Sequence, residues 1–246
     1  MLTINKSYPS KNFSEREHGI IRYLILHYTE RDFETSLRLL TQGEVSSHYL
    51  ISEEGGVYQL VDEKNKAFHA GVSHWHEDEG LNETSIGIEI VNGGFESGFP
   101  EFPQKQIESV IALCQGIIQR YNILPQHVLA HSDIAPNRKA DPGPQFPWKQ
   151  LAGAGVGAWF NESLIESELV SRHCEERSGE AIQILDVQEK LARYGYYIQP
   201  TGILDDQTRC VLKAFQMHFR ARDYSGAADL ETEVLLIELL KKYFPA

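Results

Sequence analysis

The chain has 246 residues, of which 41% are hydrophobic and 24% are charged, and its formal net charge at pH 7 is −12. This length suits one full domain with a buried core and a second, smaller domain. Such an acidic chain argues against non-specific nucleic-acid binding, which needs a basic surface, so we expect no nucleic-acid partner. No stretch of the sequence approaches the ~18 consecutive apolar residues of a membrane-spanning helix, so we expect no integral membrane segment.

Hydrophobic patterning predicts alternating strands and helices up to about residue 159. The segment 85–91 alternates in polarity, with three isoleucines on one face and with Gly87 and Glu89 on the other. In chain order the predicted elements are a strand at 22–28, a helix at 33–41, a hairpin of 46–51 and 57–61, a strand at 85–91, a helix at 104–121 and a strand at 127–131. This alternation indicates an α/β fold with a central mixed β-sheet flanked by helices.

The composition changes after residue 160. The segment 161–180 holds six glutamates and two arginines with little apolar periodicity, which is typical of a linker or of a partly helical insertion. Apolar residues then recur at helical spacing in three short stretches, which predicts a small three-helix C-terminal domain. The expected organisation is an N-terminal extension at 1–20, a catalytic α/β domain at 21–160, an acidic linker or insertion at 161–182 and a three-helix domain at 183–246.

Two histidines and one aspartate form the main candidate site. His27 and His131 end predicted strands, and Asp141 follows His131 by ten residues. A sheet fixes the relative positions of its strand ends, so side chains placed there can converge. Two imidazoles and one carboxylate complete the protein ligands of a catalytic zinc ion, whose fourth position holds a water that can attack an amide. The sequence therefore predicts a hydrolase with one zinc ion per chain.

Two further residues fit catalytic roles beside this site. Pro142 disfavours helical geometry for Asp141, so an extended chain would place Lys139 on the same side as Asp141, where it would stabilise an oxyanion. Glu89 lies opposite three isoleucines on its strand and is suited to take a proton from the attacking water and to pass it to the leaving amine. The structural alternative is an ion pair between Lys139 and Glu89.

Six short motifs follow one another along the chain: ILHYT at 25–29, VSSHYLI at 45–51, FHAG at 68–71, TSIGIEI at 84–90, AHSDIAP at 130–136 and RKADPGP at 138–144. The series resembles that of the zinc-dependent N-acetylmuramoyl-L-alanine amidases of the AmiD and AmpD type, whose fold is related to that of peptidoglycan recognition proteins. The resemblance implies zinc ligation and catalysis by the five residues named above. It also implies a substrate, the amide between N-acetylmuramic acid, including its 1,6-anhydro form, and L-alanine of the peptidoglycan stem peptide. Weaker candidates for substrate contacts are His69, Trp75, Asn92 and Arg138, with scaffold roles as the alternative for His69 and Trp75.

The C-terminal segment resembles a three-helix peptidoglycan-binding domain, through a pattern that includes Val187, Leu191, Gly195 and Phe215. Peptidoglycan or a muropeptide is therefore the expected partner. This substrate favours the periplasm or cell envelope, and the cytoplasm is the alternative because the N-terminal residues show neither a secretory signal nor a cysteine for a lipid anchor.

Two other functions were compatible with parts of the sequence. A non-catalytic peptidoglycan-recognition protein of the same fold typically lacks a zinc ligand, whereas all three ligands are present here. A cysteine amidohydrolase would need Cys114 as its nucleophile, but this residue falls on the apolar stripe of the predicted helix at 104–121. We therefore expect an enzyme of the zinc amidase family.

Overall fold

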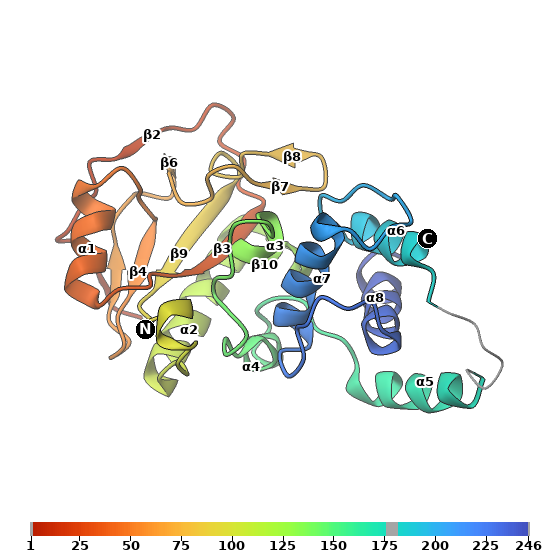
Figure 1. Cartoon of the computed structure of the whole chain (residues 1–246). Coiled ribbons are helices and arrows are strands. Elements are labelled where there is room, and N and C mark those ends of the chain that lie inside the picture. The colour runs from red at the N-terminus through yellow and green to blue at the C-terminus, as the bar shows by residue number, and fades with distance from the viewer. Residues whose placement is uncertain (1, 176–181, 246) are drawn as a thin grey trace.

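The computed structural model describes residues 2–175 and 182–245, with a sheet-containing N-terminal part and a helical C-terminal part (Figure 1). Its strands are β1 Ile4–Asn5, β2 Phe13–Glu15, β3 Tyr23–Tyr28, β4 Tyr49–Ile51, β5 Val57–Gln59, β6 Asn65–Ala67, β7 His74–Trp75, β8 Asp78–Glu79, β9 Ser85–Ile90 and β10 Val128–Ala130. Its helices are α1 Phe33–Gln42, α2 Gln104–Tyr121, α3 His131–Ile134, α4 Trp148–Gly153, α5 Glu162–Glu175, α6 Ile184–Tyr194, α7 Asp206–Phe219 and α8 Leu230–Tyr243, with short 3-10 turns η1 Phe95–Ser97 and η2 Pro125–His127.

The central sheet has six strands in the order β1-β5-β4-β9-β3-β10. Strands β4, β9, β3 and β10 pair in parallel, whereas β4 and β5 form an antiparallel hairpin. The predicted mixed sheet and its hairpin are therefore confirmed. In the register of β3 against β9, His27 lies directly beside Glu89. Side chains of paired residues in neighbouring strands point to the same face, so these two residues share one face of the sheet.

The opposite face of the sheet is apolar and is covered by α2. Ile86 and Ile88 of β9 pack with Val110 and Ile117 of α2 in one buried cluster. The strand alternates every second residue and the helix repeats every three to four residues, so each element presents one continuous apolar surface. Burial of each such side chain contributes roughly 1.5–3 kcal/mol. This packing leaves the polar face of β9 free for Glu89.

The three predicted C-terminal helices are present as α6, α7 and α8, drawn in blue tones in Figure 1. They pack on the side of the sheet that faces away from α2. Tyr23 and Ile25 of β3 belong to the same buried cluster as Leu191, Phe215 and Leu235 of these helices. The sheet and the C-terminal helices therefore share one hydrophobic core.

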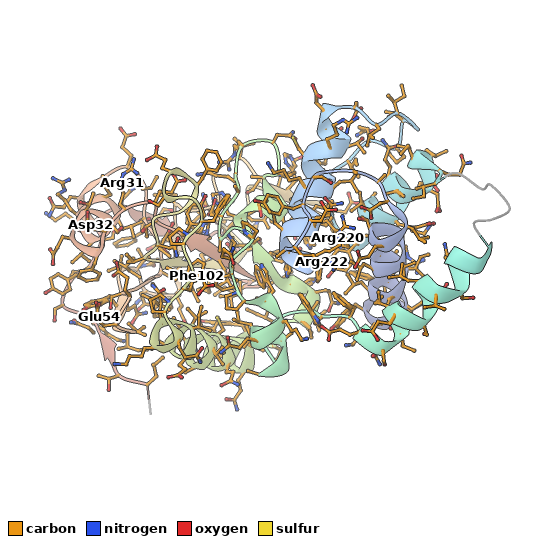
Figure 2. All side chains as sticks on the ribbon, turned by 60° about the horizontal axis from the view of Figure 1, so that its bottom comes forward. Arg31, Asp32, Glu54, Phe102, Arg220 and Arg222 are labelled. Atoms are coloured by element: carbon orange, nitrogen blue, oxygen red, sulfur yellow. The ribbon has the colours of Figure 1, made fainter. Side chains whose placement is uncertain are left out.

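A buried arginine connects the last two helices. Arg220 follows α7 and forms a two-pronged ion pair with Asp229, with both nitrogen–oxygen distances at 2.8 Å. Asp229 is also the N-cap of α8, since its side chain accepts from the backbone N–H of Thr232 at 2.9 Å. Figure 2 shows Arg220 and its neighbour Arg222 beside these helices.

Two parts of the fold differ from the sequence-based expectation. The sequence predicts no strand or helix in the N-terminal extension 1–20, but β1 pairs with β5 and β2 pairs with β6. Both strands are short edge strands with few apolar residues, so they leave no periodic pattern. The strand expected at 127–131 ends at Ala130, because the Asp133 carboxylate accepts from the Ala130 N–H at 2.8 Å and starts α3 at His131.

The acidic segment is partly helical, which is one of the two alternatives that the sequence left open. Its residues 162–175 form α5, which lies along α8, where Arg172 contacts Glu233 at 3.3 Å. The remaining residues of this segment, 176–181, lie outside the described part of the chain. Across the residues that the structure describes, we find no helix with the length and apolar character needed to traverse a bilayer.

Trp75, expected among the substrate contacts, is fully buried instead. Its indole lies 4.9 Å from the ring of Tyr196, centroid to centroid, and a Cβ atom at Gly195 would come within 2.5 Å of it. The side chain thus packs β7 against the loop that follows α6 and has no surface left for a ligand. This buried packing is the scaffold role that the sequence left open as the alternative to a substrate contact.

We expect Trp75→Ala to lower the free energy of unfolding by about 3–5 kcal/mol, because it opens a cavity between the sheet domain and the C-terminal helices. Urea unfolding followed by circular dichroism measures the loss. Tyr8→Ala, which removes a half-exposed aromatic ring, is the control and should change stability far less. A Trp75→Ala protein as stable as the control would contradict the assigned packing role.

Candidate metal centre

The side chains of His27, His131 and Asp141 meet at one edge of the sheet. His27 is the penultimate residue of β3, and His131 follows β10, the strand that pairs with β3. The two Nδ1 atoms are 2.9 Å apart, and the Asp141 Oδ2 atom lies 3.1 Å from His27 Nδ1 and 2.9 Å from His131 Nδ1. The backbone N–H of Ser132 donates to the Asp141 carbonyl at 3.0 Å, which holds the aspartate loop against α3.

This set has the chemistry of a metal-ligand cluster. All three residues are buried, and their ligand atoms lie within 4.8 Å of one another. Burial and the neighbouring His131 lower the pKa of His27 to about 4, so its Nδ1 carries a free lone pair at neutral pH. Burial opposes ionisation of Asp141, but the adjacent imidazoles of His131 and His27 hold its pKa well below the ordinary value. Two imidazoles and one carboxylate fit a divalent metal ion.

The outer nitrogen of His131 is fixed by a backbone carbonyl. His131 Nε2 lies 3.1 Å from the oxygen of Ala70, to which it donates. Arg138 donates to the same oxygen at 2.6 Å and to the oxygen of Val72 at 2.7 Å. Such a partner holds a ligating imidazole in one tautomer and orientation. Arg138, expected to contact substrate, is thus bonded to the loop that supports His131.

The outer nitrogen of His27 is fixed by a chain of side chains. His27 Nε2 lies 3.0 Å from His69 Nδ1, His69 Nε2 lies 3.3 Å from the Ser85 hydroxyl, and that hydroxyl donates to the Leu81 carbonyl at 2.6 Å. Donation in this order leaves the Nδ1 lone pair of His27 directed at the cluster. Burial lowers the pKa of His69 well below its ordinary value, which keeps this ring neutral.

Gly87 makes room for the His69 ring. A Cβ atom at this position would lie 2.4 Å from the ring, closer than any real contact allows. The glycine in the middle of a buried strand, two residues before Glu89, is therefore the sequence feature that accommodates His69. His69, a weak candidate for a substrate contact, lies behind His27 instead.

Glu89 faces the metal-ligand cluster from β9. Its Oε1 atom is 4.0 Å from His27 Nδ1. Burial, reinforced by the charge of Asp141, raises the pKa of Glu89 well above its ordinary value, and Lys139 opposes this shift. Lys139 is exposed on the loop before Asp141 and lines a groove of about 540 Å³ that opens beside that ligand. Glu89 thus lies beside the cluster, and Lys139 lines the groove on the loop that carries Asp141.

Asn92, the remaining expected substrate contact, shapes the loop that follows β9. Its side-chain nitrogen donates to the Pro100 carbonyl at 3.0 Å, and its side-chain oxygen accepts from the Gly94 N–H at 2.9 Å. Both ends of the amide are therefore used within the loop.

Sequence reasoning missed one group that supports the site from the C-terminal domain. Asp133, two residues after His131, is buried, and its carboxylate accepts from the Tyr196 hydroxyl at 2.6 Å and from His218 Nδ1 at 2.7 Å. The His218 ring also stacks on Trp148, with centroids 3.7 Å apart. Asp133 falls in the AHSDIAP motif, but neither Tyr196 nor His218 carries a local pattern that predicts this contact.

A mixed sheet carries a buried His-His-Asp cluster, with a carboxylate and a lysine beside an open groove, which is the arrangement of a hydrolase with a candidate metal site. The chain belongs to the N-acetylmuramoyl-L-alanine amidase family, whose profile matches residues 17–144. Residues 181–236 match the profile of a peptidoglycan binding domain. The expected enzyme class is therefore confirmed.

Individual relatives extend this similarity over nearly the whole chain. The N-acetylmuramoyl-L-alanine amidase AmiD of Escherichia coli K12 is 43% identical over 91% of this chain and 83% of its own length. The structure of that E. coli amidase in complex with anhydro-N-acetylmuramic acid-L-Ala-D-gamma-Glu-L-Lys aligns over its full length with 96% of the present chain. The TM-score is 0.82 and the sequence identity is 40%. AmpDh3 of Pseudomonas aeruginosa covers both chains completely, with a TM-score of 0.84 and 40% identity.

We expect His69→Ala to weaken metal binding by about 10- to 100-fold, because it removes the partner that orients His27. Competition with a chromophoric chelator measures the affinity. His27→Ala should lose binding altogether, and His18→Ala, at an exposed position, is the matched control. Equal affinities for His69→Ala and the control would show that His27 needs no such support.

Proposed function

We propose that this protein is a zinc enzyme that hydrolyses the amide between the lactyl group of N-acetylmuramic acid and L-alanine of the stem peptide. The observation that carries the proposal is the convergence of His27, His131 and Asp141 beside an open groove. Because two relatives were solved with anhydromuramic peptides, we infer that 1,6-anhydro-muropeptides are among the substrates, in the turnover or recycling of cell-wall material.

His27, His131 and Asp141 would hold the zinc ion. When bound, such an ion activates water and polarises the carbonyl of the scissile amide. Glu89 Oε1 lies on the cluster side of β9, 4.0 Å from His27 Nδ1, and the raised pKa of this carboxyl group suits it to accept a proton from the attacking water and to release it again. The same carboxyl group then gives this proton to the leaving nitrogen of L-alanine. The Lys139 ammonium, at the groove beside Asp141, stabilises the negative charge on the carbonyl oxygen.

Incubation of the protein with anhydromuramyl-L-Ala-γ-D-Glu-L-Lys should release the free tripeptide. Chromatography measures this release. Removal of metal with a chelator should abolish release, and added zinc should restore it. Glu89→Gln should lower kcat by about 10²- to 10⁴-fold, because proton transfer is lost, while the bound zinc measured by elemental analysis stays unchanged. Activity after thorough metal removal, or wild-type turnover by His27→Ala, would refute the zinc mechanism.

We further propose that the protein acts in the cell envelope, since intact peptidoglycan lies there. Action on imported fragments in the cytoplasm is the alternative. Cell fractionation followed by immunoblotting distinguishes the two, and a signal confined to the cytosolic fraction would exclude the envelope.

A further inference from the structure

The groove beside the metal-ligand cluster is built by both domains. Its floor is the loop 136–141, which carries Lys139 and Asp141, and one wall is aromatic, from Tyr28, Phe95 and Phe99. The facing wall belongs to the C-terminal domain, where Cys210, Lys213 and Met217 of α7, together with Tyr224, line the same space. Residues at this spacing lie on one face of a helix, so α7 presents a continuous surface to the groove.

The position of this wall is fixed by contacts already described. Met217 precedes His218, whose ring is bonded to Asp133 and stacked on Trp148. The groove face of α7 is therefore tied to the residue that lies two positions after the metal ligand His131. A side chain on this face of α7 therefore keeps a fixed position relative to His131 and the metal-ligand cluster.

Lys213 is the cation of that wall. It is exposed, and its Nζ lies 5.8 Å from the centroid of the Tyr224 ring. Within residues 2–175 and 182–245, the lysines that form ion pairs are Lys66, Lys149 and Lys190, so Lys213 has no carboxylate partner there. The charge of Lys213 is therefore available to a ligand, in a chain whose net charge is −12.

The groove also holds Lys139 and Arg138, although the Arg138 guanidinium is bonded to the Ala70 and Val72 carbonyls. Glu30 lines the aromatic side, and Asp141 belongs to the metal-ligand cluster. Among the residues that line the groove, those from α7 include one cation, Lys213, and no carboxylate. Charge complementarity therefore favours an anionic group at this wall.

The substrate of the proposed function supplies such groups. A stem peptide linked through the γ-carboxyl of D-glutamate keeps its α-carboxylate free, and the last residue ends in a second carboxylate. We propose that Lys213 binds a free carboxylate of the stem peptide, so that the C-terminal domain forms part of the substrate site and selects acidic over amidated stems. This inference rests on the proposed amidase function.

The test pairs two substrates with variants of the full-length protein. One substrate is anhydromuramyl-L-Ala-γ-D-Glu-L-Lys, and the other carries both carboxylates as amides. Lys213→Ala should raise KM for the acidic substrate by about 3- to 5-fold with kcat unchanged, and should leave the amidated substrate unaffected. Lys213→Glu should raise KM further because it adds repulsion, and Lys213→Arg should retain most of the affinity. The matched control is Lys105→Ala, which removes an exposed lysine from α2.

A binding measurement separates this inference from the amidase proposal. Calorimetry with the tripeptide L-Ala-γ-D-Glu-L-Lys reports affinity without turnover, and Lys213→Ala should weaken it by the same factor. If the wild type binds the tripeptide through Lys213 but cleaves no muropeptide, the amidase proposal fails and the inference stands. If Lys213→Ala matches Lys105→Ala, or changes KM equally for both substrates, the inference is overturned whether or not cleavage occurs.

Discussion

The parallel pairing of β3 with β9 and β10 is the constraint on which the site depends. It places His27 beside Glu89 in register and brings the end of β10 to the end of β3, where His131 follows. Because the isoleucines of β9 are buried against α2, a shift of one residue would turn Glu89 into the apolar core. The hydrophobic core thus enforces the register, and the register fixes the distance between Glu89, the proposed proton-transfer group, and His27, a proposed metal ligand.

Burial around this pairing also sets the protonation states that the site requires. His27 stays neutral because charging it in a closed environment is costly, and its outer nitrogen still finds a partner in His69. Glu89, on the same face, resists ionisation for the same reason. These protonation states agree with the proposed roles of the imidazole as a metal ligand and of the carboxyl group as a proton exchanger, although the two residues belong to neighbouring strands of one sheet.

Features with a local pattern were predictable from the sequence. The apolar repeat gave α2 from Gln104 to Tyr121 at its observed bounds, and the alternation of β9 placed Glu89 away from the core. The convergence of His27, His131 and Asp141 was expected from residue types and motif order. Contacts between distant segments left no such signal. The burial of Trp75 against the loop after α6, like the short helix that begins at His131, depends on partners far away in the chain or on a single capping contact.

The carboxylate of Asp133 has a consequence for how such proteins are assembled from parts. It lies inside the sheet domain, but its two side-chain partners, Tyr196 and His218, come from the C-terminal helices. Exchanging these helices for an unrelated binding domain would remove both side-chain partners of this carboxylate and would expose Tyr23 and Ile25 of β3 to water. The two halves are therefore not interchangeable modules joined by a tether. A functional chimera would have to carry over the interface residues of α6 and α7 together with the domain they belong to.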